Sequence, residues 1–144
     1  MMIVINAKGQ IAGRLSARIA KFLLAGEEVA VIEAQDSVLS GTLQSHIARM
    51  HLRRTQKDKR DPEKSPKYPK LPHLLFRRMV RGMLPKKSQR GRDALHLFRA
   101  YTGTPATLAN EKAVSYPELS KADSLRKKIT LGELCRVFGY EERI

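Results

Sequence analysis

The side chains best suited to binding chemistry in this sequence are lysines and arginines crowded into one third of the chain. Between Arg49 and Arg92 the sequence has sixteen Lys and Arg residues against three acids, Asp58, Asp61 and Glu63. Charge of one sign at this density destabilises a compact fold unless an anionic partner neutralises it, and a phosphate backbone has the matching charge density. The block therefore predicts binding to a nucleic acid.

The block begins on a predicted helix and continues as an arm. Leu43, Ile47 and Met50 have the spacing of a buried helical stripe. The basic side of the same helical wheel has Arg49, Arg53, Lys57 and Arg60. Residues 53–67 have no large apolar side chain, and four prolines lie between positions 62 and 72. We expect this arm to project from the core and to become ordered only against its partner.

A two-faced helix is predicted to begin at Pro72 and to end before Pro85. Its apolar half has Leu75, Phe76, Met79, Val80, Met83 and Leu84, and its other side has Arg77, Arg78 and Arg81. One face should therefore pack on the core while the other faces phosphate. Gly82 lies between the two faces, where a missing side chain suits either close approach of another backbone or helix packing.

A loop rich in hydrogen-bond donors is predicted after Pro85. It presents the cations Lys86, Lys87, Arg90 and Arg92, together with Ser88 and Gln89. Because these groups donate to phosphate oxygens, the loop is typical of a contact with the backbone of folded RNA. A merely solvated turn is disfavoured, since the sequence has no acid between Glu63 and Asp93.

The elements expected to position these cations begin with a strand, a helix and a second strand. Residues 3–5 and 29–32 are short β-branched apolar runs, and Ile11 to Phe22 repeat at helical spacing before Gly26. This order predicts a βαβ unit and a sheet that is at least partly parallel. Near the end of the chain, Thr130 and Glu133 have the spacing of a capping box that starts a last helix.

The same N-terminal region holds the best alternative to RNA binding. Gly9, Gly13 and Arg14 follow a predicted strand and open a helix, and Glu33 comes twenty residues after Gly13, which resembles a dinucleotide site. The spacing is GxxxG, however, so the backbone cradle for a pyrophosphate is incomplete. We expect Gly9 to turn the chain, Gly13 to let the helix pack on the strand, and Arg14 either to cap the sheet edge or to touch phosphate.

Composition narrows the class of protein further. With 144 residues, of which 42% are hydrophobic, we expect one domain over residues 1–144, with a basic extension at about 49–92. No apolar run is long enough to span a membrane, and residues 1–5 are too short for the core of a signal peptide, so a cytoplasmic protein is expected. Cys135 is the only cysteine and should be a small core residue, and the histidines lack metal-ligand spacing, so no metal is expected.

Several segments resemble one family. Gly82-Met-Leu-Pro-Lys-Lys with Arg90-Gly91 is similar to the signature of ribosomal protein thirteen of the large subunit. Four other segments are similar to the same family and follow in the same order: Ala12-Gly-Arg-Leu15, Ser40-Gly41, Tyr101-Thr-Gly-Thr-Pro105 and Thr130-Leu-Gly-Glu-Leu134. The resemblance spans nearly the whole chain, and the N-terminus and closing helix look like the archaeal branch.

This resemblance implies a three-layer α/β/α fold with a mainly parallel four-stranded sheet and a basic extension. It implies a structural protein of the ribosome that binds large-subunit ribosomal RNA, has neighbouring large-subunit ribosomal proteins as partners and supports subunit assembly. No catalytic residue, cofactor, membrane or small-molecule substrate is expected. The RNA-binding residues expected are Arg14, Arg49, Arg53, Arg54, Lys57, Lys59, Arg60, Lys64, Lys67, Tyr68, Lys70, Arg77, Arg78, Arg81, Lys86, Lys87, Ser88, Gln89, Arg90 and Arg92.

Within this set, Tyr68 is expected to stack on an unpaired base, since single-stranded bases are bound by aromatic side chains. Two other functions remain open. An RNA-modifying enzyme that depends on a nucleotide or cofactor would have to use Glu33, Asp36, Ser37 or Ser40 near the strand ends. A free-standing regulator could instead bind messenger RNA through the same basic surface.

The first prediction concerns salt. RNA affinity should fall steeply as salt rises, with a log–log slope of roughly 0.7 to 0.9 for each phosphate that the cations neutralise. Filter binding or fluorescence anisotropy over a salt series measures this slope. An affinity that does not change with salt would rule out binding through phosphates.

Overall fold

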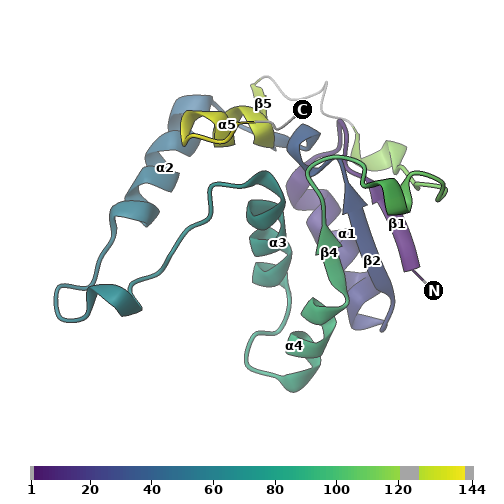
Figure 1. Cartoon of the computed structure of the whole chain (residues 1–144), viewed down its shortest axis with the longest axis horizontal. Helices are drawn as coiled ribbons and strands as arrows, with labels where there is room; N and C mark the ends of the chain where they lie inside the picture. Colours follow the sequence, from purple (N-terminus) through teal and green to yellow (C-terminus); the bar gives the residue numbers. More distant parts are fainter. Residues whose placement is uncertain (1, 121–126, 142–144) are drawn as a thin grey trace.

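The computed structural model describes residues 2–120 and 127–141. Its strands are β1 (Met2–Asn6), β2 (Glu28–Ile32), β3 (Val38–Ser40), β4 (Phe98–Ala100) and β5 (Lys128–Thr130). Its α-helices are α1 (Ala12–Leu24), α2 (Leu43–Thr55), α3 (Pro72–Met83), α4 (Gln89–His96) and α5 (Leu131–Val137). Figure 1 shows a sheet packed against helices, with one long arm extending between α2 and α3.

The main sheet has β2 at its centre, paired in parallel with β1 and with β4. The predicted βαβ unit is therefore confirmed, and Gly26 ends α1 with a φ of 90°. In the described part of the chain this sheet has three strands instead of the four expected. Beyond β1 the pairing is reduced to one parallel bridge between Ile5 and Val114, where the Val114 N–H donates to the Val4 carbonyl over 2.8 Å.

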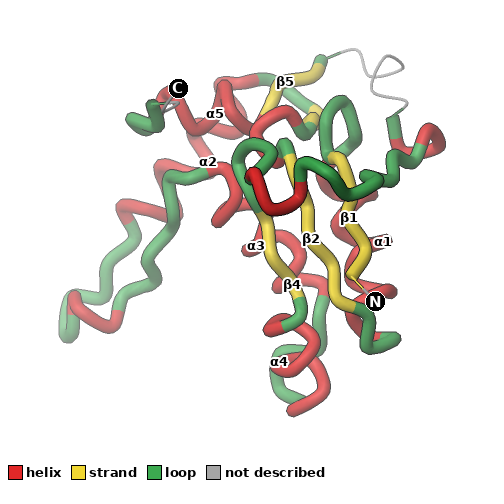
Figure 2. Tube along the Cα trace, turned by 45° about the vertical axis from the view of Figure 1, so that its right-hand side comes forward, coloured by secondary structure: helices red, strands yellow, loops and turns green. Residues whose placement is uncertain are grey.

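Alternation along the strands assigns each face of the sheet. Ile5, Val29 and Val31 pack into the larger core with α1 and α3, because successive residues of a strand point to opposite faces. Val4, Ala30 and Ile32 pack instead against Leu108. Leu108 belongs to the irregular segment 101–119, which lies in front of the strands in Figure 2, with the helices behind. The described residues place no α-helix on this second face, so the expected three helical and sheet layers are not seen.

A second, antiparallel sheet pairs a strand of the N-terminal third with one near the C-terminus, and sequence patterns missed it. β3 pairs with β5 through residues 38–40 and 128–130. α5 follows β5 directly and begins with the predicted capping box, in which the Glu133 N–H donates to Thr130 Oγ1 and the Thr130 N–H donates to the Glu133 carboxylate. Cys135 on this helix is fully buried, as expected, and burial raises the pKa of its thiol to about 12.

The helices of the described ranges are too short or too polar to cross a membrane.

The surroundings of two glycines differ from what the sequence predicted. Gly13 is exposed, and a Cβ there would meet nothing within 4 Å, so the expected close packing on a strand is wrong. Gly91 on α4 is the tightly packed one, since a Cβ there would lie 2.1 Å from the Pro85 carbonyl oxygen.

This contrast makes the second prediction. Gly91→Ala should lower the free energy of unfolding by about 1 to 3 kcal/mol, because the new methyl group forces α4 away from the turn at Pro85. The matched control Gly13→Ala adds the same group to open space on a helix and should be neutral or stabilising by up to about 1 kcal/mol. Urea denaturation of both variants measures the difference; equal stabilities would contradict the packing at Gly91.

Candidate nucleic-acid interface

The basic block is distributed over α2, the arm of residues 56–71, α3 and the start of α4. Figure 1 shows the arm leaving the end of α2, turning at its tip and returning to α3. The turn holds a short 3-10 helix, Pro62–Lys64, and the Asp58 N–H donates to Ser65 Oγ across it over 2.8 Å. The arm therefore projects from the core, as the lack of large apolar side chains in residues 53–67 predicted.

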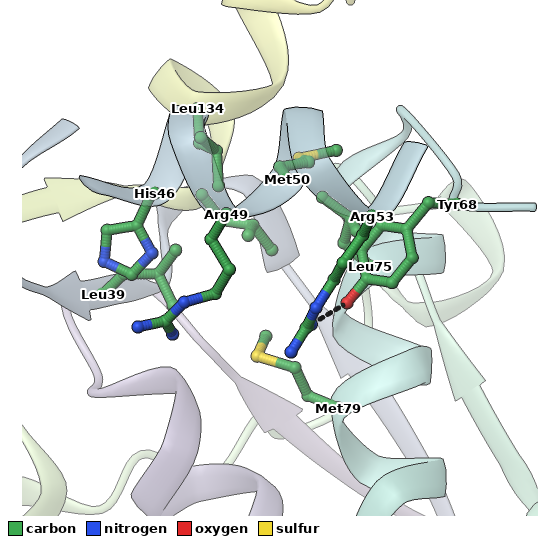
Figure 3. A pocket seen from close by; sticks show the side chains of 10 residues that line it. Leu39, His46, Arg49, Met50, Arg53, Tyr68, Leu75, Met79 and Leu134 are labelled. Atoms are coloured by element: carbon green, nitrogen blue, oxygen red, sulfur yellow. Dashed lines mark hydrogen bonds between the residues drawn. The ribbon is translucent and has the colours of Figure 1, made fainter. Parts of the chain in front are cut away.

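Tyr68 attaches the returning end of the arm to both neighbouring helices. The Arg53 guanidinium of α2 donates to Tyr68 Oη over 2.7 Å, as Figure 3 shows. Arg78 of α3 lies over the ring, 4.2 Å from its centroid, and donates to the Lys67 carbonyl over 3.0 Å. Tyr68, expected to stack on a base, thus has cation–π contacts within its own chain. The three side chains form a bridge across the root of the arm.

The length of α2 corrects one prediction. The helix ends at Thr55, so Lys57 and Arg60 lie on the arm and not on the basic side of α2. Thr55 Oγ1 donates back to the His51 carbonyl over 2.9 Å, and no apolar side chain follows to continue the packed face. Arg49 and Arg53 remain on the helix. Arg54 points toward α5, with its guanidinium 5.2 Å from the centre of the Phe138 ring.

A second correction concerns residues 88–92, which were predicted as a loop but form the first turn of α4. Ser88 is the N-cap, and its Oγ accepts from the Gly91 N–H over 3.3 Å. Arg92 donates to Gln89 Oε1 over 2.8 Å, so these side chains already have partners. Arg90 donates to the Leu24 carbonyl at the end of α1 over 2.9 Å. Of the four cations predicted to lie in a loop, Lys86 and Lys87 do lie in a turn, whereas Arg90 and Arg92 lie on α4.

Most cations of the block have no partner of opposite charge in the part of the chain that the structure describes. Among the described residues, the ion pair found in the block joins Lys64 to Asp61 over 2.7 Å; the Lys64 side chain is exposed and Asp61 is partly buried. The cations that are exposed and form no side-chain hydrogen bond or ion pair with described residues are Arg49, Lys57, Lys59, Arg60, Lys67, Lys70, Arg77, Arg81, Lys86 and Lys87. Arg14 is likewise exposed, on the first turn of α1. An anionic partner could reach all of them.

Two cavities open side by side between α2 and α3. One has a volume of about 470 Å³ and is lined by cations, with Arg53, Arg78, Arg81 and Lys86 around the backbone of Gly82. A Cβ at Gly82 would meet nothing within 4 Å, so helix packing inside this chain does not explain that glycine. The other cavity has a volume of about 240 Å³ and mostly apolar walls. The first cavity is also lined by Gln56, Pro66 and Met79, which sequence patterns did not identify as residues of an RNA site.

The residues of the alternative enzymatic site have structural partners. Glu33 accepts from Thr104 over 2.7 Å and from Gln35 over 3.0 Å, and it has a left-handed backbone with a φ of 56°. Ser37 is buried and donates to the Ala34 carbonyl, while the Ser40 carbonyl bonds the His46 ring. Gly9 turns the chain with a φ of 70°, as predicted. Within the ranges that the structure describes, no three His, Cys, Asp or Glu residues gather to bind a metal.

An α/β domain with exposed, unpaired cations on two helices and a projecting arm has the surface of a protein that binds a phosphate backbone. Residues 1–107 match the family described as ribosomal protein L13. The chain is 42% identical to large ribosomal subunit protein uL13 of Methanopyrus kandleri over 143 residues, 96% of this chain and 87% of the relative. It is 39% identical to uL13 of Archaeoglobus fulgidus, over 95% of this chain and 87% of that relative. It is 34% identical to uL13 of Methanococcus maripaludis, over 96% of this chain and 98% of that relative. The chain belongs to the ribosomal protein L13 family, which confirms the resemblance seen in its motifs.

The third prediction tests the bridge at Tyr68. Tyr68→Ala removes both cation–π contacts and the hydrogen bond, so backbone amides of residues 56–71 should exchange with solvent at least several-fold faster. Tyr68→Phe keeps the ring and should have a smaller effect. Hydrogen–deuterium exchange with peptide resolution measures both variants, and amides of β2 serve as the internal control. Unchanged exchange in the arm of Tyr68→Ala would show that the bridge does not hold it.

Proposed function

We propose that this protein is a structural constituent of the large ribosomal subunit that binds ribosomal RNA and supports subunit assembly. The observation that carries the proposal is a set of exposed cations on α2, the arm, α3 and the following turn, in a chain of the ribosomal protein L13 family. These cations have no acidic partner among the described residues. Such a surface gains free energy when phosphates replace its counterions. A cytoplasmic location, in the ribosome, follows from this role.

In this role the sheet and α1 act as a rigid support. α3 packs its apolar side, including Leu75, Phe76 and Val80, into the core, and its opposite side presents Arg77 and Arg81. The arm extends the cationic surface beyond the core, so it can enter the space between neighbouring RNA helices. Because the surface is dominated by charge, recognition rests on the shape and backbone of the RNA more than on its base sequence.

The residues assigned to RNA divide according to their contacts. The exposed, unpaired cations, with Arg14, are proposed to bind phosphates directly. Arg53, Arg78, Arg90 and Arg92 have partners in the chain, but each guanidinium has five donors and so retains N–H groups for phosphate. Ser88 and Gln89 contribute mainly by holding the first turn of α4. Neighbouring ribosomal proteins are proposed as further partners, and no catalytic role is proposed.

The experiment is sedimentation of the protein from cell extracts through a sucrose gradient. The wild-type protein should move with large subunits after a high-salt wash. Lys86→Ala with Lys87→Ala should move a larger share of the protein to the top fractions, because two phosphate contacts are lost while exposed charges contribute little to folding. The control is Lys8→Ala with Lys112→Ala, which removes the same charge from exposed positions outside the block.

Release of the wild-type protein into the top fractions would contradict an integral ribosomal role and favour the free-standing regulator. Equal retention of the two double variants would instead show that the turn at Lys86 does not contribute. Equal melting temperatures of both double variants would exclude loss of folding as the cause of any release.

A further inference from the structure

The two cavities between α2 and α3 adjoin each other and share part of their walls. Arg53, Tyr68 and Met79 line both of them. The cavity on one side of these shared residues has a cationic lining without an acid. The cavity on the other side has a mostly apolar lining. A site with one charged and one mostly apolar compartment matches a ligand that has an anionic group and, a few bonds away, an aromatic ring with apolar faces.

We propose that the two cavities together bind one unpaired nucleotide of the RNA, with its phosphate in the cationic cavity and its base in the apolar one. This inference rests on the proposed function, because the nucleotide belongs to the same ribosomal RNA. It adds a site for a single nucleotide to a surface otherwise described by charge alone.

The phosphate side is formed around the exposed end of α3. Arg81 and Lys86 are exposed, and their side chains form no hydrogen bond or ion pair with described residues, so their side-chain N–H groups are available. Gly82 lies between them in sequence and is exposed, with nothing within 4 Å of the place where a Cβ would be. The cationic side chains of Arg81 and Lys86 can therefore contact a phosphate in this cavity, because Gly82 adds no side chain to its wall.

The base side is an apolar cavity with a cationic rim. Met50, Leu75 and Leu134 are buried and form part of its floor, and Met79 stands at the boundary with the cationic cavity. Figure 3 shows Arg49 and Arg53 extending from α2 on either side of the opening, with Met79 facing them from α3. An engineered apolar cavity of about 150 Å³ holds a benzene ring, so a volume of about 240 Å³ leaves room for a larger ring. The flexible methionines adapt to such a ring and make favourable sulfur–aromatic contacts.

Charge favours a nucleotide over the side chain of a neighbouring protein. An apolar side chain would fill the apolar cavity but would leave the adjoining cations of Arg81 and Lys86 without an anion. A nucleotide supplies both parts, and unpaired bases of RNA are commonly extruded and bound in this way. The position of both cavities at the root of the arm also joins them to the cationic surface proposed for the RNA backbone.

The experiment uses the full chain and a transcript of the large-subunit ribosomal RNA from the same organism. Chemical probing of bases and riboses, with and without the wild-type protein, should show one unpaired nucleotide whose base becomes protected on binding. Leu39→Trp adds bulk to the apolar cavity alone, so it should remove this protection and weaken binding at least about fivefold, the loss of one stacked base.

A second variant tests the phosphate side. Gly82→Leu should weaken RNA binding, while the melting temperature should stay the same or rise because leucine favours the helix. The matched control Ala109→Leu adds a larger side chain at an exposed position of the segment that covers the second face of the sheet, and it should bind RNA like the wild type. A helix glycine that served folding alone would show the opposite result, with lower stability and unchanged affinity.

The outcomes separate the nucleotide site from the proposed function. If binding protects only paired nucleotides, or if both variants bind the transcript like the wild type, the nucleotide site is wrong while RNA binding stands. If Leu39→Trp keeps its RNA affinity but loses a neighbouring protein from assembled subunits, the apolar cavity binds protein instead. A wild-type protein without salt-dependent binding to the transcript would refute the proposed function itself. Should Leu39→Trp fail to fold, the nucleotide site is still tested by base protection with the wild-type protein and by the RNA affinity of Gly82→Leu.

Discussion

Repulsion among the cations of residues 49–92 is the constraint on which the arrangement of this protein depends. The structure separates that charge from its core. The buried cluster combines apolar side chains of the sheet, α1, α3 and α5. The unpaired cations lie on exposed positions of α2 and α3, on the arm or in the turn after α3. The charge therefore costs little core packing, and its repulsion is offset only when an anion binds.

α3 and Tyr68 connect the two parts. α3 buries Phe76 and Val80 completely, and its Arg78 contacts the Tyr68 ring, so one helix joins the core to the root of the arm. The arm therefore leaves the core at a defined point, although its residues 56–67 have no large apolar side chain to pack. The same contacts bring Met79 and Gly82 to the two cavities, so the anchor of the arm and the proposed nucleotide site depend on one group of side chains.

Local patterns predicted the elements whose apolar residues repeat within a single segment. β1, α1, β2, α3 and α5 were all expected from periodicity, prolines and a capping box. The errors lie where a tertiary contact decides the outcome. Gly91 was predicted as a loop residue, yet it lies in α4, where only a glycine fits against the Pro85 carbonyl. β3 and β5 have three residues each and exist because segments about ninety residues apart pair with each other. The expected fourth strand of the main sheet is reduced to a bridge at Val114.

For the site, the sequence by itself determined the chemistry: the sign and density of the charge, and an arm that cannot bury itself. These follow from residue types and their order, which no fold can change. The tertiary structure decided which cations have a hydrogen-bond partner within the chain, because such partners can be distant in sequence. Arg90, for example, donates to the carbonyl of Leu24, 66 residues away. It also decided that an apolar and a cationic cavity meet beside Tyr68. Residues from β3, α2, the arm, α3 and α5 form those walls, and only folding brings such distant segments together.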